Sequence, residues 1–174
     1  MRRMLTFAAA MLLAACGGPD ATPGPQATPT PTAPAEQRIA DEGRAHVEEG
    51  TFITFNHYPP SSGDHYGRLL SWQAYEQDVP EGYWIHNLEH GGVVLLYNCS
   101  TPCPDTVSIL NGLYNDLKKS KYGHVKLVVV PNNRIRSHIT VVAWNWQLDL
   151  ATPDAKAIEA FYEAHVDKGP EDVP

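Results

Sequence analysis

Two short apolar runs separated by an amphipathic segment constrain the fold of this chain more than any other feature. The runs occupy residues 93–98 and 125–130, and neither alternates apolar with polar side chains, so each predicts a strand covered on both faces. Between them, residues 104–119 carry apolar side chains at helical spacing, and Pro104 suits the first position of a helix. Strand, helix and strand in this order predict a right-handed crossover between parallel strands.

Further segments complete a small layered domain. Residues 139–148 predict a third strand, and the short turn before it favours antiparallel pairing with the second strand. On one strand, Trp144 and Trp146 would share a face. Residues 51–55 are β-branched and aromatic, which predicts another strand, and Thr152 is expected to cap a last helix. The expected fold is a single α/β domain, in which helices pack on a small mixed sheet.

The amino terminus has the pattern of a bacterial lipoprotein signal. Two arginines precede an apolar run that is too short to span a membrane, and this run ends in Leu-Ala-Ala before Cys16. Residues 1–15 are therefore expected to be a signal peptide, and Cys16 to be acylated. The alternative is a free or disulfide-bonded Cys16. Residues 16–35 are rich in proline and threonine and predict an extended linker, which leaves residues 36–174 for the globular domain.

The charge balance narrows the choice of partners. The chain has 20 acidic against 13 Lys and Arg residues, a formal net charge of −7, and it has no basic run. Nucleic acid is therefore not an expected partner. We expect an extracytoplasmic protein attached through Cys16 to the cell membrane or outer membrane, with a metal ion or an envelope protein as further partner. No cofactor fingerprint is present, so no organic cofactor is expected.

Histidines are concentrated between residues 57 and 92. His86 and His90 are four residues apart, so on a helix both rings lie on one face and can bind one metal ion beside Glu89. His65 and His57 precede them in loops and are candidates for further ligands. A set of imidazoles suits zinc or copper(II). The alternative is that these side chains cap turns and strands by hydrogen bonds.

Three classes of function are compatible with this pattern. The first is metal binding or delivery at the cell envelope. The second is a metal-dependent hydrolase acting on an envelope substrate, in which Glu89 would activate a metal-bound water. The third is a structural or protein-binding module in which the histidines are only caps. Whether the chain is an enzyme stays open.

Cys99 and Cys103 are an even pair once Cys16 serves as the anchor, which favours a disulfide in an oxidising compartment. They follow a predicted strand and precede a predicted helix, where thioredoxin-like proteins keep their redox pair. Three residues rather than two separate them, however. A structural disulfide is therefore favoured over a redox-active dithiol.

Several motifs together resemble a bacterial family, the domain of unknown function 3105. The resemblance covers residues 41–174 and rests on Asp-Glu-Gly at 41–43, His-Val and Glu-Gly within 46–50, PPSSGDHY at 59–66 and HNLEHGGV at 86–93. Ala-Trp at 143–144 and Gly-Pro-Glu at 169–171 fit it as well. It implies a site made by His46, His65, His86, Glu89 and His90, with Gly63 and Gly91 as backbone positions. His57 and the cysteine pair lie outside the pattern. The resemblance implies no activity.

Overall fold

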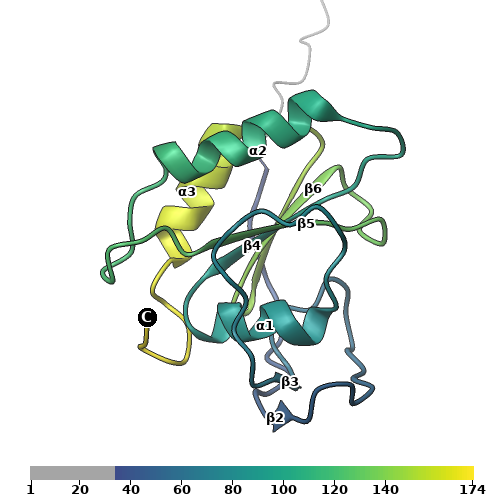
Figure 1. Cartoon of the computed structure of the whole chain (residues 1–174), viewed down its shortest axis with the longest axis vertical. Coiled ribbons are helices and arrows are strands. Elements are labelled where there is room, and N and C mark those ends of the chain that lie inside the picture. Colours follow the sequence, from purple (N-terminus) through teal and green to yellow (C-terminus); the bar gives the residue numbers. More distant parts are fainter. Residues whose placement is uncertain (1–33) are drawn as a thin grey trace, which may run out of the picture. The chain divides into compact units, whose positions relative to one another are not determined.

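A five-stranded mixed sheet forms the centre of the structure, a computed structural model that describes residues 34–174 (Figure 1). The strands are ordered β1-β7-β6-β4-β5; β4 runs parallel to β5, and the other neighbours are antiparallel. Their bounds are Gln37–Arg38 (β1), Val93–Tyr97 (β4), Leu127–Pro131 (β5), Ile139–Ala143 (β6) and Trp146–Leu150 (β7). A separate two-stranded sheet pairs β2 (His46–Val47) with β3 (His65–Tyr66) in parallel.

Three helices cover the two faces of the large sheet. Helices α2 (Pro104–Asp116) and α3 (Ala155–His165) lie on one face, and α1 (Glu81–Glu89) lies on the other (Figure 1). Val93 and Leu95 of β4 belong to the core under α2 and α3, whereas Val94 and Leu96 belong to the core under α1. The strand is thus buried on both faces, as its apolar run predicts.

The predicted α/β class and the strand-helix-strand crossover are confirmed. Helix α2 begins at Pro104 and connects the parallel strands β4 and β5. None of the helices within residues 34–174 is long and apolar enough to span a membrane. The predicted signal peptide, Cys16 and almost all of the predicted linker lie outside the described residues.

The single strand predicted for residues 139–148 is wrong, because the segment forms a hairpin of β6 and β7. The chain turns at Asn145, whose φ is +63°, a conformation that asparagine tolerates better than most residues. Trp144 and Trp146 therefore do not share a face: they pack against the α1 core and the α2/α3 core respectively.

The predicted pairing of the third strand with the second is also wrong. Strand β6 pairs with β4 and β7, not with β5. All five residues of β6 are buried. Such a strand is better accommodated in the middle of the sheet than at the exposed edge beyond β5.

Two smaller expectations are wrong for reasons of tertiary structure. Residues 51–55 form no strand, and Phe52 is 88 % exposed. The sheet edges have other partners, since β1 pairs with β7 and Ala74 bridges to β5. Helix α3 is capped by Asp154 rather than Thr152, because the Asp154 side chain accepts hydrogen bonds from the N–H groups of residues 156 and 157.

Candidate metal centre

Helix α1 carries one half of a histidine cluster. His86 and Glu89 lie on the helix, and His90 caps its carboxyl end. Residues three and four apart on a helix share a face, so these three side chains project together. The opposite face is fixed in the apolar core by Trp84, Ile85 and Leu88.

The small parallel sheet supplies the other half. His46 of β2 and His65 of β3 are register partners, and their ring centroids are 4.7 Å apart. Gly63 leads into β3 with a φ of +120°, a conformation that favours glycine. Its N–H donates to the Gly43 carbonyl at 2.7 Å, which holds the approach to β3 against the approach to β2.

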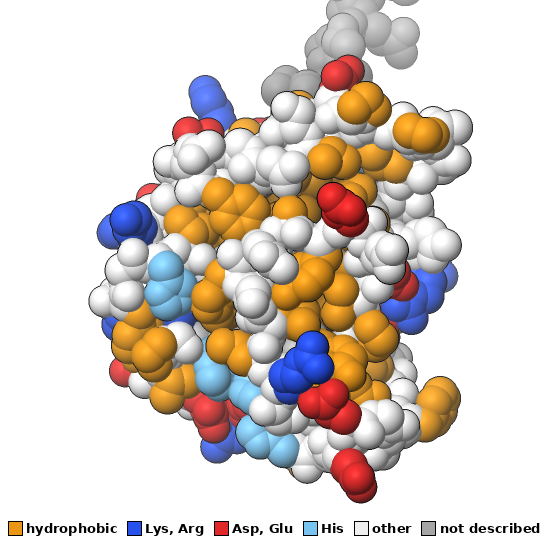
Figure 2. Space-filling view, viewed as in Figure 1, with side chains coloured by type: hydrophobic (Ala, Val, Ile, Leu, Met, Phe, Trp, Pro, Cys, Tyr) orange, Lys and Arg blue, Asp and Glu red, His pale blue; other side chains and the backbone are white. Residues whose placement is uncertain are grey.

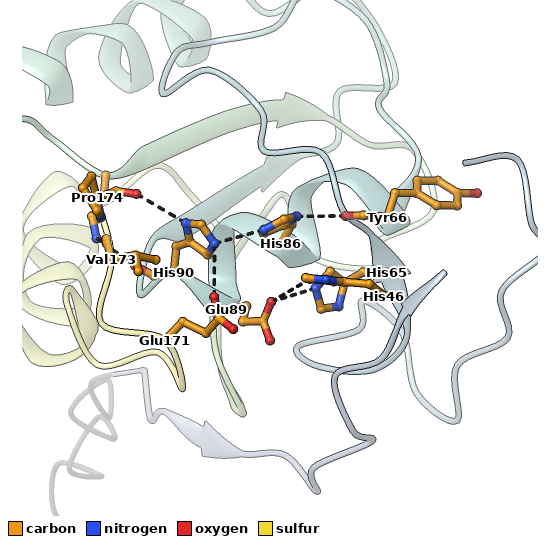
Figure 3. A network of polar contacts seen from close by, with 10 residues as sticks. His46, His65, Tyr66, His86, Glu89, His90, Glu171, Val173 and Pro174 are labelled. Carbon is orange, nitrogen blue, oxygen red and sulfur yellow. Dashed lines mark hydrogen bonds and ion pairs between the residues drawn. The ribbon is translucent and has the colours of Figure 1, made fainter. Parts of the chain in front are cut away.

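The two halves meet at one place (Figure 3). Glu89 Oε2 lies 3.2 Å from His46 Nε2 and 2.9 Å from His65 Nε2. The Nε2 atoms of His86 and His90 are 3.0 Å apart, and the ring centroids of His46 and His86 are 4.9 Å apart. Figure 2 shows histidine side chains gathered at the surface in the lower half of the molecule, next to acidic side chains.

The main chain holds the second nitrogen of the two buried rings, His65 and His86. Nδ1 of His65 lies 2.8 Å from the Gly63 carbonyl oxygen, and Nδ1 of His86 lies 2.9 Å from the Tyr66 carbonyl oxygen. A carbonyl oxygen can only accept a hydrogen bond, so both Nδ1 atoms carry the proton. With Nδ1 occupied in this way, Nε2 is the nitrogen of each ring that faces the cluster, and it can offer a lone pair there as the ligand nitrogen of a metal-binding histidine does.

These lone pairs face other electron-rich atoms. Nε2 of His65 points at the Glu89 carboxylate, and Nε2 of His86 points at Nε2 of His90. His90 in turn has its Nδ1 3.3 Å from the main-chain oxygen of Pro174. Glu89 is only 2 % exposed, and a buried carboxylate is costly without a compensating charge. A bound cation, or protons taken up in its place, would resolve these contacts.

The electrostatics of the cluster favour the neutral form of His86. Burial of the ring lowers its pKa below the usual value for histidine, although the hydrogen bond to the Tyr66 carbonyl opposes this shift. The neighbouring rings lower the pKa further; they are His90, His65 and His46. Because only neutral imidazole binds a metal ion, this environment suits a ligand near neutral pH.

The C-terminal segment, residues 167–174, closes the outer side of the cluster (Figure 3). The Glu171 carboxylate lies 3.6 Å from His90 Nε2. The segment passes so close to the end of α1 that a Cβ on Gly91 would lie 2.9 Å from Asp167 Cα. Gly91 also has a φ of +73°, so glycine is required at this position for two reasons.

Lys126 fastens this segment to α1. Its side chain is 1 % exposed, and Nζ donates to the main-chain oxygens of His90 at 2.8 Å and Val173 at 2.6 Å. Asp167 Oδ1 lies 3.3 Å from the same nitrogen. Burial lowers the pKa of Lys126, and the Asp167 carboxylate opposes that shift.

The structure brings together most of the predicted ligands and separates one. His46, His65, His86 and His90 lie in the cluster with Glu89, the candidate water-activating residue. His57 does not: its Nδ1 lies 3.1 Å from Glu42 Oε1 instead.

Two overlapping groups within the cluster could hold a metal ion: His46, His65 and His86, and also His86, Glu89 and His90. In each group the ligand atoms lie within 4.8 Å of one another. Tetrahedral zinc with nitrogen ligands would hold them about 3.4 Å apart. Around such an ion no pair of ligand atoms would have to approach by more than about 1.4 Å.

Sequence reasoning did not identify the outer residues of the site. Glu171 belongs to a motif that fits the family resemblance, but no pattern predicted that Glu171 or Lys126 would reach the site, because this depends on the path of the C-terminal segment and of the chain before β5. The cysteines lie elsewhere, at the far end of β4. The sulfur atoms of Cys99 and Cys103 are at disulfide-bonding distance, and their Cα atoms are 6.2 Å apart.

Comparison with known proteins gives one match. No curated protein and no solved structure matches the chain. A family model matches residues 46–174, which include the four clustered histidines and Glu89 but not the Asp-Glu-Gly motif at 41–43. The chain therefore belongs to the family described as protein of unknown function DUF3105.

Proposed function

We propose that the chain binds a divalent transition-metal ion, zinc or copper(II), through the Nε2 atoms of His65, His86 and His90, together with Glu89 and His46. The observation that carries the proposal is the pair of Nδ1 contacts with main-chain carbonyl groups, at 2.8 Å for His65 and 2.9 Å for His86. These contacts fix Nδ1 as the donor nitrogen of both rings and turn both Nε2 atoms toward the cluster.

Metal binding accounts for the cluster better than hydrogen-bond capping does. A capping histidine donates to or accepts from the backbone and has no reason to face another ring nitrogen. Here Nε2 of His86 faces Nε2 of His90, and Nε2 of His65 faces a buried carboxylate. A divalent cation placed between these atoms would compensate the negative charge of Glu89 and accept a coordinate bond from each of them.

The ligand chemistry limits the choice of ion. Imidazole nitrogens with one carboxylate suit zinc or copper(II), whereas calcium and magnesium prefer oxygen-only shells. All three methionines precede residue 12, and Cys99 and Cys103 are paired with each other away from the cluster. Soft sulfur ligation of copper(I) at this centre is therefore not proposed.

We also propose that the centre works outside the cytoplasm, on a chain attached to a bacterial membrane through acylated Cys16. The support is the signal-like pattern of residues 1–15 and the proline- and threonine-rich composition of residues 16–35. In that position the function would be to bind or deliver metal at the cell envelope.

Direct metal analysis tests the proposed centre. The full chain, purified without a polyhistidine tag and stripped with a chelator, is titrated with zinc or copper(II) sulfate, and bound metal is measured after desalting. We expect about one ion per chain and a higher unfolding temperature, because an ion that binds only the folded state stabilises it. The variants His65→Ala and His86→Ala should each lose the bound ion.

His57→Ala is the matched control, because it removes an imidazole that lies against Glu42 rather than in the cluster. It should keep the full metal content. A wild-type chain that binds neither ion, or a His65→Ala His86→Ala double variant with unchanged metal content, would overturn the proposal.

A further inference from the structure

The cysteine pair lies at the opposite end of β4 from the histidine cluster and has its own chemical surroundings. Strand β4 begins at Val93, close to the cluster, and ends at Tyr97, just before Cys99. The loop between the cysteines is solvent-exposed, and both cysteines are half-buried and line an open hollow at the surface.

An imidazole lies against one of the sulfur atoms. Nε2 of His138 is 3.6 Å from Cys99 Sγ and 3.4 Å from Thr106 Oγ1. The main chain fixes this placement, because the N–H of Asn98 donates to the His138 carbonyl at 2.9 Å where β6 begins beside β4. A histidine next to a cysteine favours the thiolate over the thiol.

The second sulfur has a different source of stabilisation. Cys103 is the N-cap of α2, a helix of 13 residues with Pro104 at its first position. The amino-terminal end of a helix carries partial positive charge, which also lowers the pKa of a cysteine thiol. Each half of the pair therefore has a neighbour that stabilises it as a thiolate once the disulfide is broken.

A purely structural role explains less of this arrangement. A disulfide between residues four apart closes a short loop, for which the entropic stabilisation is smallest. Helix α2 is already anchored by Leu110 and Leu113, which are 0 % and 2 % exposed. The burial of these two leucines holds α2 without the disulfide, and a structural disulfide does not require an imidazole beside Cys99.

We propose that the Cys99–Cys103 disulfide is redox-active and oxidises a dithiol, with His138 stabilising the thiolate that leaves. The proposal is independent of the metal centre. The position of the pair between β4 and α2 is compatible with disulfide exchange, and the contact with His138 favours it.

The exchange takes place in two balanced steps. A substrate thiolate attacks Cys103 Sγ; a substrate–Cys103 disulfide forms, the Cys99–Cys103 bond breaks, and Cys99 leaves as a thiolate beside His138. The second substrate thiolate then attacks the substrate sulfur of the mixed disulfide, which forms the substrate disulfide and releases Cys103 as a thiolate. Two electrons pass from the substrate to the cysteine pair, and the two protons of the substrate thiols end on the pair or in solvent.

The surface beside the disulfide indicates the class of substrate. A shallow hollow of about 570 Å³ runs along the pair and contains no lysine, arginine or acidic residue. It is lined by Tyr97, Ser100, Thr101, Pro102, Pro104 and Val107, besides the cysteines. An apolar protein segment that carries a pair of cysteines fits this surface better than a charged small thiol such as glutathione.

Thiol trapping tests the activity. The full chain is incubated with dithiothreitol, or with a peptide that carries two cysteines between apolar residues, and free thiols are trapped with a maleimide of known mass. We expect reduction of the folded protein with formation of an equal amount of oxidised peptide. His138→Ala should slow the reaction about tenfold or more.

A spectroscopic readout separates the proposed role of His138 from a structural one. The reduced wild-type protein at neutral pH should show ultraviolet absorbance of a thiolate that falls in His138→Ala, while circular dichroism confirms that both proteins are folded. Metal content should be the same in both proteins. A negative result for the redox activity would therefore not count against the proposed metal centre. A disulfide that stays oxidised in the folded protein, or equal rates and equal thiolate absorbance in His138→Ala, would overturn the proposal.

Discussion

Glu89 is the acidic side chain buried within the histidine cluster. It is buried between His46 and His65, and it has no lysine or arginine partner among the described residues. Its carboxylate would stabilise a bound cation. Without a cation the buried charge has only imidazole neighbours and lowers the stability of the fold. The effect of removing the charge should therefore depend on whether metal is present.

Glu89→Gln tests this dependence, because glutamine keeps the size and loses the charge. We expect metal affinity to fall by about ten- to a hundredfold, while the metal-free variant is as stable as the metal-free wild type or more so. The zinc-induced gain in unfolding free energy should shrink by about 1.4 to 2.7 kcal/mol, measured by urea unfolding with and without zinc. A variant that is destabilised without metal yet binds zinc normally would make Glu89 a structural residue.

Asp41 holds the hairpin turn by a network that depends on its charge. Its Oδ2 accepts from Asn145 Nδ2 at 2.7 Å and from Trp144 Nε1 at 3.2 Å. The hydrogen bond from Asn145 is the main cause that lowers the pKa of Asp41 below its usual 3.8, and the Gly43 N–H adds to it. A lowered carboxyl pKa contributes stability above the unfolded pKa and loses it as pH falls through the folded pKa.

Asp41→Asn should accordingly cost stability at neutral pH but not in acid. We expect a loss of about 1 kcal/mol near pH 7, kept small by the exposure of the side chain to solvent. The difference from wild type should begin to shrink as the pH falls below about 3.8 and should disappear once the pH lies below the lowered pKa of the folded wild-type carboxyl. Urea unfolding at several pH values measures it, and a difference that stays constant into acid would contradict the assigned cause.

The candidate site was predictable where its residues are local in sequence. His86, Glu89 and His90 follow from helical spacing alone, and α1 places them as expected. No local pattern distinguishes His46, which the register of β2 and β3 brings to the site, from His57, which the fold turns toward Glu42. For those two residues the family resemblance was the better guide, since it included His46 and left His57 out.

At the scale of elements, the strands and helices that have a local sequence pattern could be predicted, whereas the pairing of the strands could not. Strands β4 and β5 and helix α2 were predictable because continuous burial and helical spacing are local patterns. The pairing of β6 with β4 was not, because it depends on which sheet position buries both faces of the strand. The break at Asn145 was missed because the apolar run continues through the turn as Trp144 and Trp146.

The C-terminal segment is the element whose attachment should control the metal centre. Lys126 joins it to the end of α1 through the His90 and Val173 main-chain oxygens. Lys126→Met keeps the buried length of the side chain but removes both hydrogen bonds. We expect residues 167–174 to exchange amide hydrogens faster and metal affinity to fall by about tenfold, because His90 loses its outer support.

Hydrogen exchange read by mass spectrometry, with zinc titration of the same samples, measures both effects of Lys126→Met. Lys119→Met, a substitution of an exposed lysine, is the control and should change neither quantity. Loss of metal binding without faster exchange in residues 167–174 would mean that Lys126 acts on the cluster by another route.

At the scale of the whole molecule, the sheet holds two chemically different sites at the two ends of one strand. The five residues of β4 separate the histidine cluster from the cysteine pair by about 15 Å, and all but Tyr97 are fully buried. Sites this far apart that share no partners usually behave additively. Coupling between two sites requires an element with two arrangements that both sites bias. A closely packed strand such as β4 has only one arrangement in this structure.

Metal affinity should therefore not depend on the redox state of the cysteines. We expect the zinc dissociation constants of the oxidised chain and of a Cys99→Ser, Cys103→Ser variant to agree within about twofold. The variant is used in place of the reduced protein because free thiolates would themselves compete for zinc. Calorimetric titration of both proteins in the same buffer measures the two constants. A difference of tenfold or more would show that β4 transmits about 1.4 kcal/mol between its ends, and the two sites would then have to be treated as one coupled unit.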